Sequence, residues 1–391
     1  MNANARRTAA VAMLLVAGVL AGAQLGKIAP LIGWYRAEAG MSLVVAGWLA
    51  SAIGFFVAVA ALPAAIAVDR FGMYRSFVLS SATLALGAVA LALLDDPAAV
   101  LGARLVEGLG YLLLVIATPA LLATLPPPRL RAPALAIWGG FVPIGFAVSD
   151  FLASFMLPGS TPRAFLLAVA LLFLAAAAAA TLLARGLEPA GPAPGAGGTA
   201  AHFSRSFSTP VVLAALAFGA YVILSMGFFS FLPTFVAERG TLLVPAWLVA
   251  LLVPAGNVLT GVLVKGRGAA YVVRLGLLGF AATAASVLPF YAAADPAMAT
   301  AAALLFALAH GVVASAIFAC VPLILPAGGS TAIAIGIIAQ TGGISTLIGP
   351  PAAGYVIATH GWPGFGVFML AVAIVGLLLM VPMLMWRPRP A

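Results

Sequence analysis

The sequence has very little charge for its length. Of its 391 residues only 18 are Lys or Arg and 9 are Asp or Glu, whereas 64% are hydrophobic. A chain of this composition has too few polar side chains to cover the surface of a water-soluble globule. The composition therefore excludes a soluble protein and predicts one whose main partner is a lipid bilayer.

Cysteine and histidine are scarcer than charged residues. Cys320 is the one cysteine, which excludes an intrachain disulfide framework and a cysteine-rich metal site. The three histidines, at positions 202, 310 and 360, are scattered and form no recognisable catalytic or metal-binding set. We therefore expect no enzyme activity, no metal and no cofactor.

The net charge of +9 raises the question of nucleic-acid binding. The basic residues stand singly or in pairs at the ends of apolar runs, and they form no basic stripe. That distribution is typical of anchored membrane helices, so we expect no nucleic-acid partner.

The apolar runs are long enough to cross a bilayer, which takes about 20 residues per helix. Charges and Pro/Gly clusters separate twelve of them, at about 9–32, 43–67, 75–94, 98–123, 133–157, 163–184, 209–236, 243–264, 268–292, 297–324, 331–358 and 363–386. The sequence thus predicts an all-α membrane protein with 12 transmembrane helices.

The basic residues also predict the orientation. With a cytoplasmic N-terminus, thirteen Lys and Arg fall in inner loops and tails, and only Arg36, Arg163 and Arg239 fall outside. The positive-inside rule then predicts that both termini are cytoplasmic. We expect the membrane to be the inner membrane of a bacterium. Arg6 and Arg7 followed by an apolar stretch mimic a signal peptide, but the repeat described next needs this run as a span.

The two halves of the chain have similar residues at matching positions, at an offset of about 200 residues, as in duplicated transporters. Pro30 followed by "AEAG" matches Pro233 followed by "AERG", and Trp48 matches Trp247. The stretch between them, "LEPAGPAPGAGGTA", has the composition of a flexible linker. We predict a six-helix bundle at 1–186, a cytoplasmic linker at 187–208 and a second bundle at 209–391, in a monomer.

Several segments together carry a family resemblance. The inner loop "AIAVDRFGMYR" has Asp69, Arg70 and Gly72 where the major facilitator superfamily has G-x-x-x-D-[RK]-x-G-R-[RK], although Ala65 replaces the first glycine and Met73 and Tyr74 replace the basic pair. The segments "RLVEGLG" (104–110), "WGGFVPIG" (138–145) and "GPPAAG" (349–354) are similar to further motifs of that family. The resemblance covers essentially the whole chain.

This resemblance implies a secondary transporter whose two bundles open alternately to each side of the membrane. It also implies a gate in the inner loop, formed by Asp69, Arg70 and Gly72, with Arg131 or Arg129 as the partner of Asp69.

Four formal charges lie well inside predicted spans: Lys27, Arg104, Glu107 and Asp150. Each costs about 3 kcal/mol at a helix centre, so each should face the protein interior and have a partner. Arg104 and Glu107 are three residues apart and share a helical face with Tyr111, and Gln24 shares a face with Lys27. We predict that Gln24, Lys27, Arg104 and Tyr111 bind substrate.

These charges leave alternatives open. Lys27 is either the partner of an anion or carboxylate, or a snorkelling anchor whose amine reaches the outer interface. Arg104 and Glu107 form either a structural ion pair or part of a binding site. Asp150 is the favoured proton carrier, with Glu107 as the alternative.

The second half has no formal charge inside its spans. It supplies neutral polar residues, of which we predict Tyr221, Asn257, His310 and Gln340 to bind substrate. A lone histidine in a helix is also often a packing residue, which is the alternative for His310.

The function predicted from these features is proton-coupled transport of a small polar organic solute. Two in-membrane cations favour an anion, but Glu107 and Asp150 cancel them formally. The segments "GKIAP", "RLVEGLG" and "WGGFVPIG" resemble those of cyanate-type and related anion carriers. The alternative is a drug or metabolite exporter of the same fold, which exchanges its substrate for protons.

Overall fold

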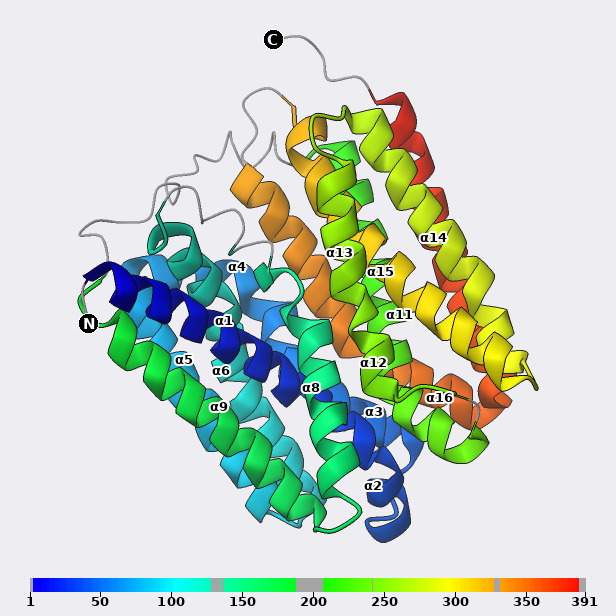
Figure 1. The fold of residues 1–391 in the computed structure, drawn as a ribbon, viewed down its shortest axis with the longest axis horizontal. Helices are drawn as coiled ribbons and strands as arrows, with labels where there is room; N and C mark the ends of the chain where they lie inside the picture. Colours follow the sequence, from blue (N-terminus) through cyan, green and yellow to red (C-terminus); the bar gives the residue numbers. More distant parts are fainter. Residues whose placement is uncertain are drawn as a thin grey trace. The chain divides into compact units, whose positions relative to one another are not determined.

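The computed structural model describes residues 3–127, 134, 137–187, 207–240, 242–326 and 331–386. All regular secondary structure in these residues is helical (Figure 1). The contacts divide the chain into two units, one made of Met1–Leu31 and Leu49–Ala196, the other of Ile32–Trp48 and Gly197–Ala391.

Among its described residues, the first unit holds six apolar helices. The first helix is α1 (Ala3–Gly26), followed by the 3₁₀ turn η1 (Ala29–Leu31), and the second is η2 (Ala52–Gly54) with α4 (Phe55–Phe71). The others are α5 (Met73–Leu93), α6 (Pro97–Thr124), α8 (Phe141–Met156) and α9 (Pro162–Ala184).

Three helices begin with the same local sequence device, a polar cap followed by proline. Asp96 accepts a hydrogen bond from the Ala99 amide at 2.9 Å, Thr161 caps α9 in the same way, and Asp295 caps the helix that begins at Pro296. The cap satisfies an amide that lacks a helical partner, and proline suits the next position because its missing N–H is not needed there.

Close backbone approach holds α1 against α8. A Cβ atom on Gly145 would collide with the backbone of Gly22, and one on Gly26 would lie 2.9 Å from the Phe146 Cα atom. Lipid tails are as apolar as leucine, so membrane helices associate through such close packing at small residues. In Figure 1, α1 (dark blue) lies beside α8 and α9, against which it packs.

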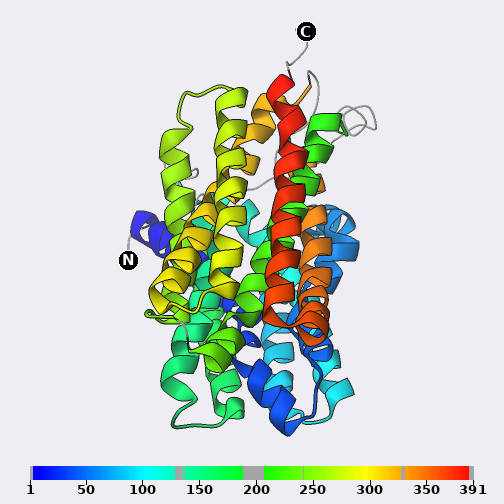
Figure 2. The same ribbon diagram turned by 90° about the vertical axis from the view of Figure 1, so that its right-hand side faces the viewer.

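The second unit is built from the remaining helices. They are α2 (Ile32–Glu38), most of α3 (Leu43–Ser51), α11 (Thr209–Arg239), α12 (Ala246–Ala250), α13 (Leu252–Leu263), α14 (Ala269–Ala292), α15 (Pro296–Ile324), α16 (Thr331–Met380) and η3 (Val381–Met385). The backbone of α16 breaks at Gly361, whose φ of 65° and ψ of −173° are not helical. Its part beyond Gly361 stands as a separate red helix in Figure 2.

The hairpin formed by α2 and α3, residues 32–48, packs within the second unit. A Cβ atom on Gly47 would collide with the Pro350 carbonyl, and one on Gly354 would collide with the Leu43 carbonyl. Glu238 of α11 binds both the Arg36 guanidinium, at 2.9 Å, and the Trp362 indole N–H, at 2.8 Å. Close packing and this polar contact therefore attach the hairpin to α11 and α16.

The number of spans agrees with the sequence prediction. Among the described residues, ten helices are long and apolar enough to cross a membrane, and one of these, Ala334–Met385, holds two helices on either side of Gly361. The shorter apolar helix Phe141–Met156 brings the total to twelve. The prediction of an all-helical membrane protein is confirmed.

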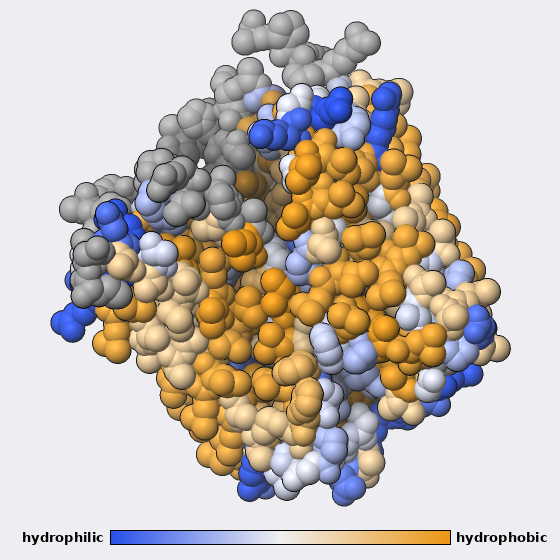
Figure 3. Space-filling view, in the orientation of Figure 1, coloured by the Kyte–Doolittle hydropathy of each residue, from blue (hydrophilic) through white to orange (hydrophobic). Residues whose placement is uncertain are grey.

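The surface of both units suits lipid. Large apolar side chains such as Leu86 and Phe155 in the first unit and Val258 in the second expose about 70% of their area, at 67%, 71% and 69%. Orange, apolar residues cover most of the visible face in Figure 3. Apolar surface of this extent is expected where a helix faces a hydrocarbon core.

The predicted domain boundaries stay a prediction. The linker expected at 187–208 lies largely outside the described residues, which stop at 187 and resume at 207. The contact pattern adds one feature that the sequence division lacked, because residues 32–48 group with the second unit.

The close α1–α8 contact gives a stability prediction. We expect Gly145→Ala to lower the free energy of unfolding by about 1–3 kcal/mol, because the added methyl forces the two backbones apart. Thermal unfolding in detergent, followed by tryptophan fluorescence, measures the change. The matched control is Gly102→Ala on α6, where a Cβ atom meets nothing within 4 Å and alanine is the better helix former. Equal melting temperatures for the two variants would contradict the prediction.

Candidate functional site

Three of the four predicted in-membrane charges form one buried cluster in the first unit. The Lys27 Nζ atom lies 2.5 Å from Glu107 Oε1, and Arg104 Nη1 lies 2.6 Å from Glu107 Oε2. All three side chains have 0% exposed area. Each oxygen of one carboxylate therefore serves one cation, which is the pairing that burial of charge requires.

Arg104 also binds four backbone carbonyls. Its Nη1 donates to Gln24 O at 2.7 Å and its Nη2 to Leu25 O at 3.3 Å. Its Nε donates to Leu49 O at 3.0 Å and its Nη2 to Ala50 O at 3.1 Å. With the bond to Glu107, these contacts engage the five N–H donors that a guanidinium has.

The acceptors of Arg104 lie at two helix ends. Gln24 and Leu25 are in the last turn of α1, which ends at Gly26, and Leu49 and Ala50 are in the last turn of α3, before the 3₁₀ turn η2. The last four carbonyls of a helix have no partner within it, so a donor from another helix is needed to satisfy them in a membrane interior. Arg104 is thus the shared cap of two broken spans.

Lys27 retains more capacity for a ligand than Arg104. Its amine donates to Gln24 Oε1 at 2.6 Å and to Glu107, whereas an ammonium group has three donors. The Gln24 amide in turn donates to Val169 O on α9 at 3.0 Å. Within the described residues, one N–H of Lys27 is therefore left over while every N–H of Arg104 is used.

Asp150 lies on α8, which packs against α1, the helix that ends just before Lys27. Its neighbour Ser149 donates to Ala23 O of α1 at 2.8 Å, which fixes this turn of α8 against the turn of α1 that precedes Lys27. Asp150 is 6% exposed, and neither carboxylate oxygen has a hydrogen-bond partner among the described residues. Tyr111, predicted on the face of Arg104, is also buried, and its ring packs 6.4 Å from that of Phe141.

Predicted residues of the second unit lie in a ring stack. His310 has 0% exposed area, and its ring centre is 4.3 Å from that of Phe306 and 4.7 Å from that of Tyr221. Its Nε2 atom lies 3.2 Å from the Tyr221 carbonyl, and its Nδ1 has no partner among the described residues. This environment favours the packing alternative for His310.

The other two predicted residues of this unit are less buried. The Asn257 side chain, on α13, accepts a hydrogen bond from Ser315 of α15 at 3.1 Å. Gln340 lies half-buried on α16. Their binding role stays a prediction.

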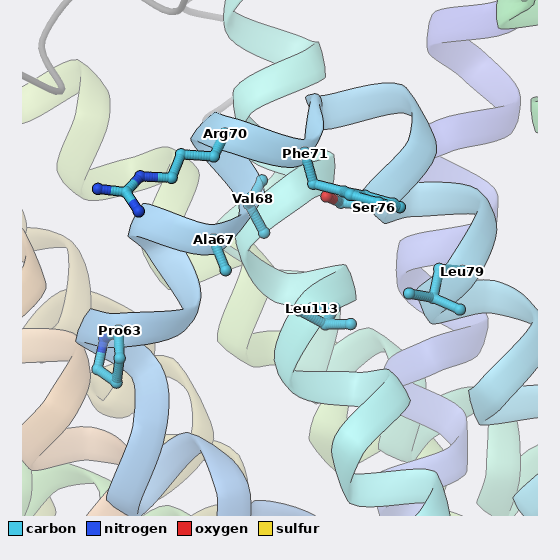
Figure 4. Close-up of a pocket in the computed structure, with 8 residues that line it drawn as sticks. All are labelled: Pro63, Ala67, Val68, Arg70, Phe71, Ser76, Leu79 and Leu113. Atoms are coloured by element: carbon cyan, nitrogen blue, oxygen red, sulfur yellow. The ribbon is translucent and has the colours of Figure 1, made fainter.

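The predicted gate is described only in part. Gly72 joins α4 to α5 with a φ of 97°, a conformation that glycine adopts without a steric penalty. Arg70 is exposed at the end of α4 (Figure 4). The Asp69 side chain, Arg129 and Arg131 lie outside the described residues, so their pairing stays a prediction.

The geometry decides one alternative and bears on another. The snorkelling interpretation of Lys27 is wrong, because the amine is fully buried and bound to Glu107. Arg104 and Glu107 do form an ion pair. Direct substrate binding by Arg104 stays a prediction that its five protein contacts weigh against.

The contacts that depend on the backbone and on the fold leave no signal in the sequence. The carbonyl acceptors of Arg104 carry no side-chain signal. Glu238, which joins Arg36 to Trp362, was visible only as the acidic residue of the repeated "AEAG" and "AERG" segments.

Comparisons with known proteins agree with the fold. The profile described as Major Facilitator Superfamily matches residues 14–338. A similar solved structure is that of a bacterial homolog to the human lysosomal transporter Spinster, in an inward-facing and unoccupied conformation. It has a TM-score of 0.75 and 16% identity, over 99% of each chain. No curated protein matches the sequence.

The cluster gives an ordering of variant stabilities. Lys27, Arg104 and Glu107 sum to +1, Lys27→Gln makes the sum 0, and Glu107→Gln makes it +2. We expect Glu107→Gln to cost about 3–5 kcal/mol, because it leaves two buried cations without an anion. The double variant restores +1 and should unfold at a higher temperature than Glu107→Gln alone. A double variant that unfolds at or below the temperature of Glu107→Gln would contradict this ordering.

The carbonyl cap gives a second prediction. Arg104→Lys keeps the charge but has three donors in place of five, so it cannot satisfy both helix ends. We expect a lower melting temperature and faster amide hydrogen exchange at residues 24–31 and 49–54. The matched control is Arg163→Lys, in the exposed pair with Asp95, which should change neither. Unchanged exchange at both helix ends would show that Arg104 acts only through its charge.

Proposed function

Because this chain belongs to the major facilitator superfamily of membrane solute transporters, we propose that it carries a small organic anion together with a proton. The first unit supplies the charged groups that bind the anion and the proton. The second unit supplies neutral hydrogen-bonding groups, from Tyr221, Asn257 and Gln340, with His310 packed behind Tyr221.

The observation that carries the proposal is an excess of buried positive charge. Lys27 and Arg104 share a single carboxylate, that of Glu107, and all three side chains are fully buried. A buried ion without a counter-ion is costly, so the cluster favours the arrival of one more negative charge. A substrate anion would supply it, with Lys27 as its main contact, because Lys27 is the cation with a remaining donor.

Asp150 supplies the coupling to protons. The cluster of Lys27, Arg104 and Glu107 carries a net charge of +1. An ionised Asp150 brings the total to zero, and a protonated Asp150 leaves it at +1. Protonation therefore favours anion binding, and anion binding favours protonation, which is reciprocal linkage between two ligands. One proton and one anion would cross together, and an unloaded carrier with ionised Asp150 would also be electrically balanced.

Alternating access would expose this cluster. Lys27 has no exposed area in this structure, so the proposal requires a second conformation in which a solute reaches it. The breaks at the ends of α1 and α3 provide places where the two spans bend. The loop with Asp69, Arg70 and Gly72, with Arg131 as the partner, would form the inner gate, in a monomer whose termini face the cytoplasm of a bacterium.

The test is transport by purified protein in proteoliposomes. A panel of small carboxylates, sugars, amino acids and cationic drugs is first screened by thermal shift, since a ligand stabilises the protein as RT ln(1 + [L]/Kd). We expect small anions to raise the melting temperature of the wild type and not of Lys27→Gln. Stabilisation by cationic drugs alone, unaffected by Lys27→Gln, would favour the exporter.

The coupling residue is tested with the anion found in that screen. Asp150→Asn is permanently neutral, so it should bind the anion with little dependence on pH and retain counterflow. It should lose accumulation driven by a proton gradient, which the wild type shows. A matched control is Asp95→Asn at the exposed Arg163 pair, which should behave as the wild type. Proton-driven accumulation by Asp150→Asn would remove Asp150 from the coupling.

A further inference from the structure

A groove lies at one end of the first unit, where α4 and α5 diverge from the Gly72 turn. It has a volume of about 570 Å³. Its walls are mostly apolar, from Pro63 and Ala67 on α4, Leu79 on α5 and Leu113 on α6 (Figure 4). Arg70 also lines it, and its side chain extends beyond the apolar walls at the end of α4.

One wall of the groove belongs to an exposed apolar face of α5. Leu79 lies on one face of α5 with Leu86 and Leu93, at a spacing of seven residues, and these side chains are 49%, 67% and 54% exposed. Such a row of exposed leucines is expected where a helix faces the hydrocarbon core. A recess in this surface is filled by lipid chains, since a dry void would forfeit the contacts of its lining atoms.

The charge at the groove favours one class of lipid. Arg70 is exposed and forms no ion pair with the side chains that the structure describes. An arginine at the level of the headgroups attracts anionic lipids, and its planar fork matches the oxygens of a phosphate. The apolar walls and the arginine at their end correspond to the two parts of a phospholipid, a chain and a charged headgroup.

We propose that this groove binds an anionic phospholipid, with an acyl chain against Pro63, Leu79 and Leu113 and the headgroup phosphate on Arg70. The lipid fills the gap between α4 and α5 next to the turn that joins them. It thereby supports the relative position of these two helices. The proposal depends on the surface of the first unit alone and is independent of the transported solute.

The test is lipid binding to the full chain in detergent, measured by native mass spectrometry. Phosphatidylglycerol is titrated against phosphatidylcholine of the same chain length, and we expect at least fivefold tighter binding of the anionic lipid. Arg70→Gln should remove this preference. Arg75→Gln is the matched control, because it makes the same charge change at an exposed residue that does not line the groove.

A second variant tests the apolar part without changing charge. Ala67→Trp fills the groove and should remove the preferred lipid while Arg70 remains. Melting temperatures in detergent show that each variant is folded. Equal losses in Arg70→Gln and Arg75→Gln would indicate diffuse surface attraction and overturn the proposal. The proposal would also be overturned if Ala67→Trp bound phosphatidylglycerol as tightly as the wild type does, or if the wild type bound the two lipids equally.

Discussion

The first unit depends on the ion pairs that the carboxylate of Glu107 forms with Lys27 and Arg104. In a membrane-embedded interior, two cations remain buried only if an anion stays beside them, so Glu107 keeps Lys27, just after α1, and Arg104 of α6 in fixed positions. Arg104 then holds the ends of α1 and α3 through their carbonyls. One ion cluster thus determines both the charge of the candidate site and the position of two helix breaks.

The two units are held together internally by different chemistry. Close glycine contacts join helices in both units, and the first unit adds the buried ion cluster of Lys27, Arg104 and Glu107. The second unit relies on rings, such as the stacked pair of Phe228 and Phe306 at 4.0 Å, and on close contact at Gly311, where a Cβ atom would collide with the Val253 carbonyl. This difference agrees with the division of roles in the proposed function, in which one unit carries charge and the other shapes the site.

Much of the fold could be predicted from the sequence, because span length, charge position and internal repetition are properties of sequence alone. The sequence predicted that each buried charge would have a partner, but it did not predict that Lys27 pairs with Glu107. The carbonyl contacts of Arg104 were not foreseeable, because every residue has a carbonyl and only the fold shows which ones lack a partner. The grouping of residues 32–48 with the second unit depends likewise on packing at Gly47 and Gly354, which has no periodic signal.

The double cap of Arg104 has a mechanical consequence for the hairpin of residues 32–48. Its two points of departure from the first unit lie within reach of a single guanidinium group, so they are neighbours in space. Both segments that lead into the hairpin are therefore held by one guanidinium group beside the charge cluster, so a shift of either segment is transmitted to the other.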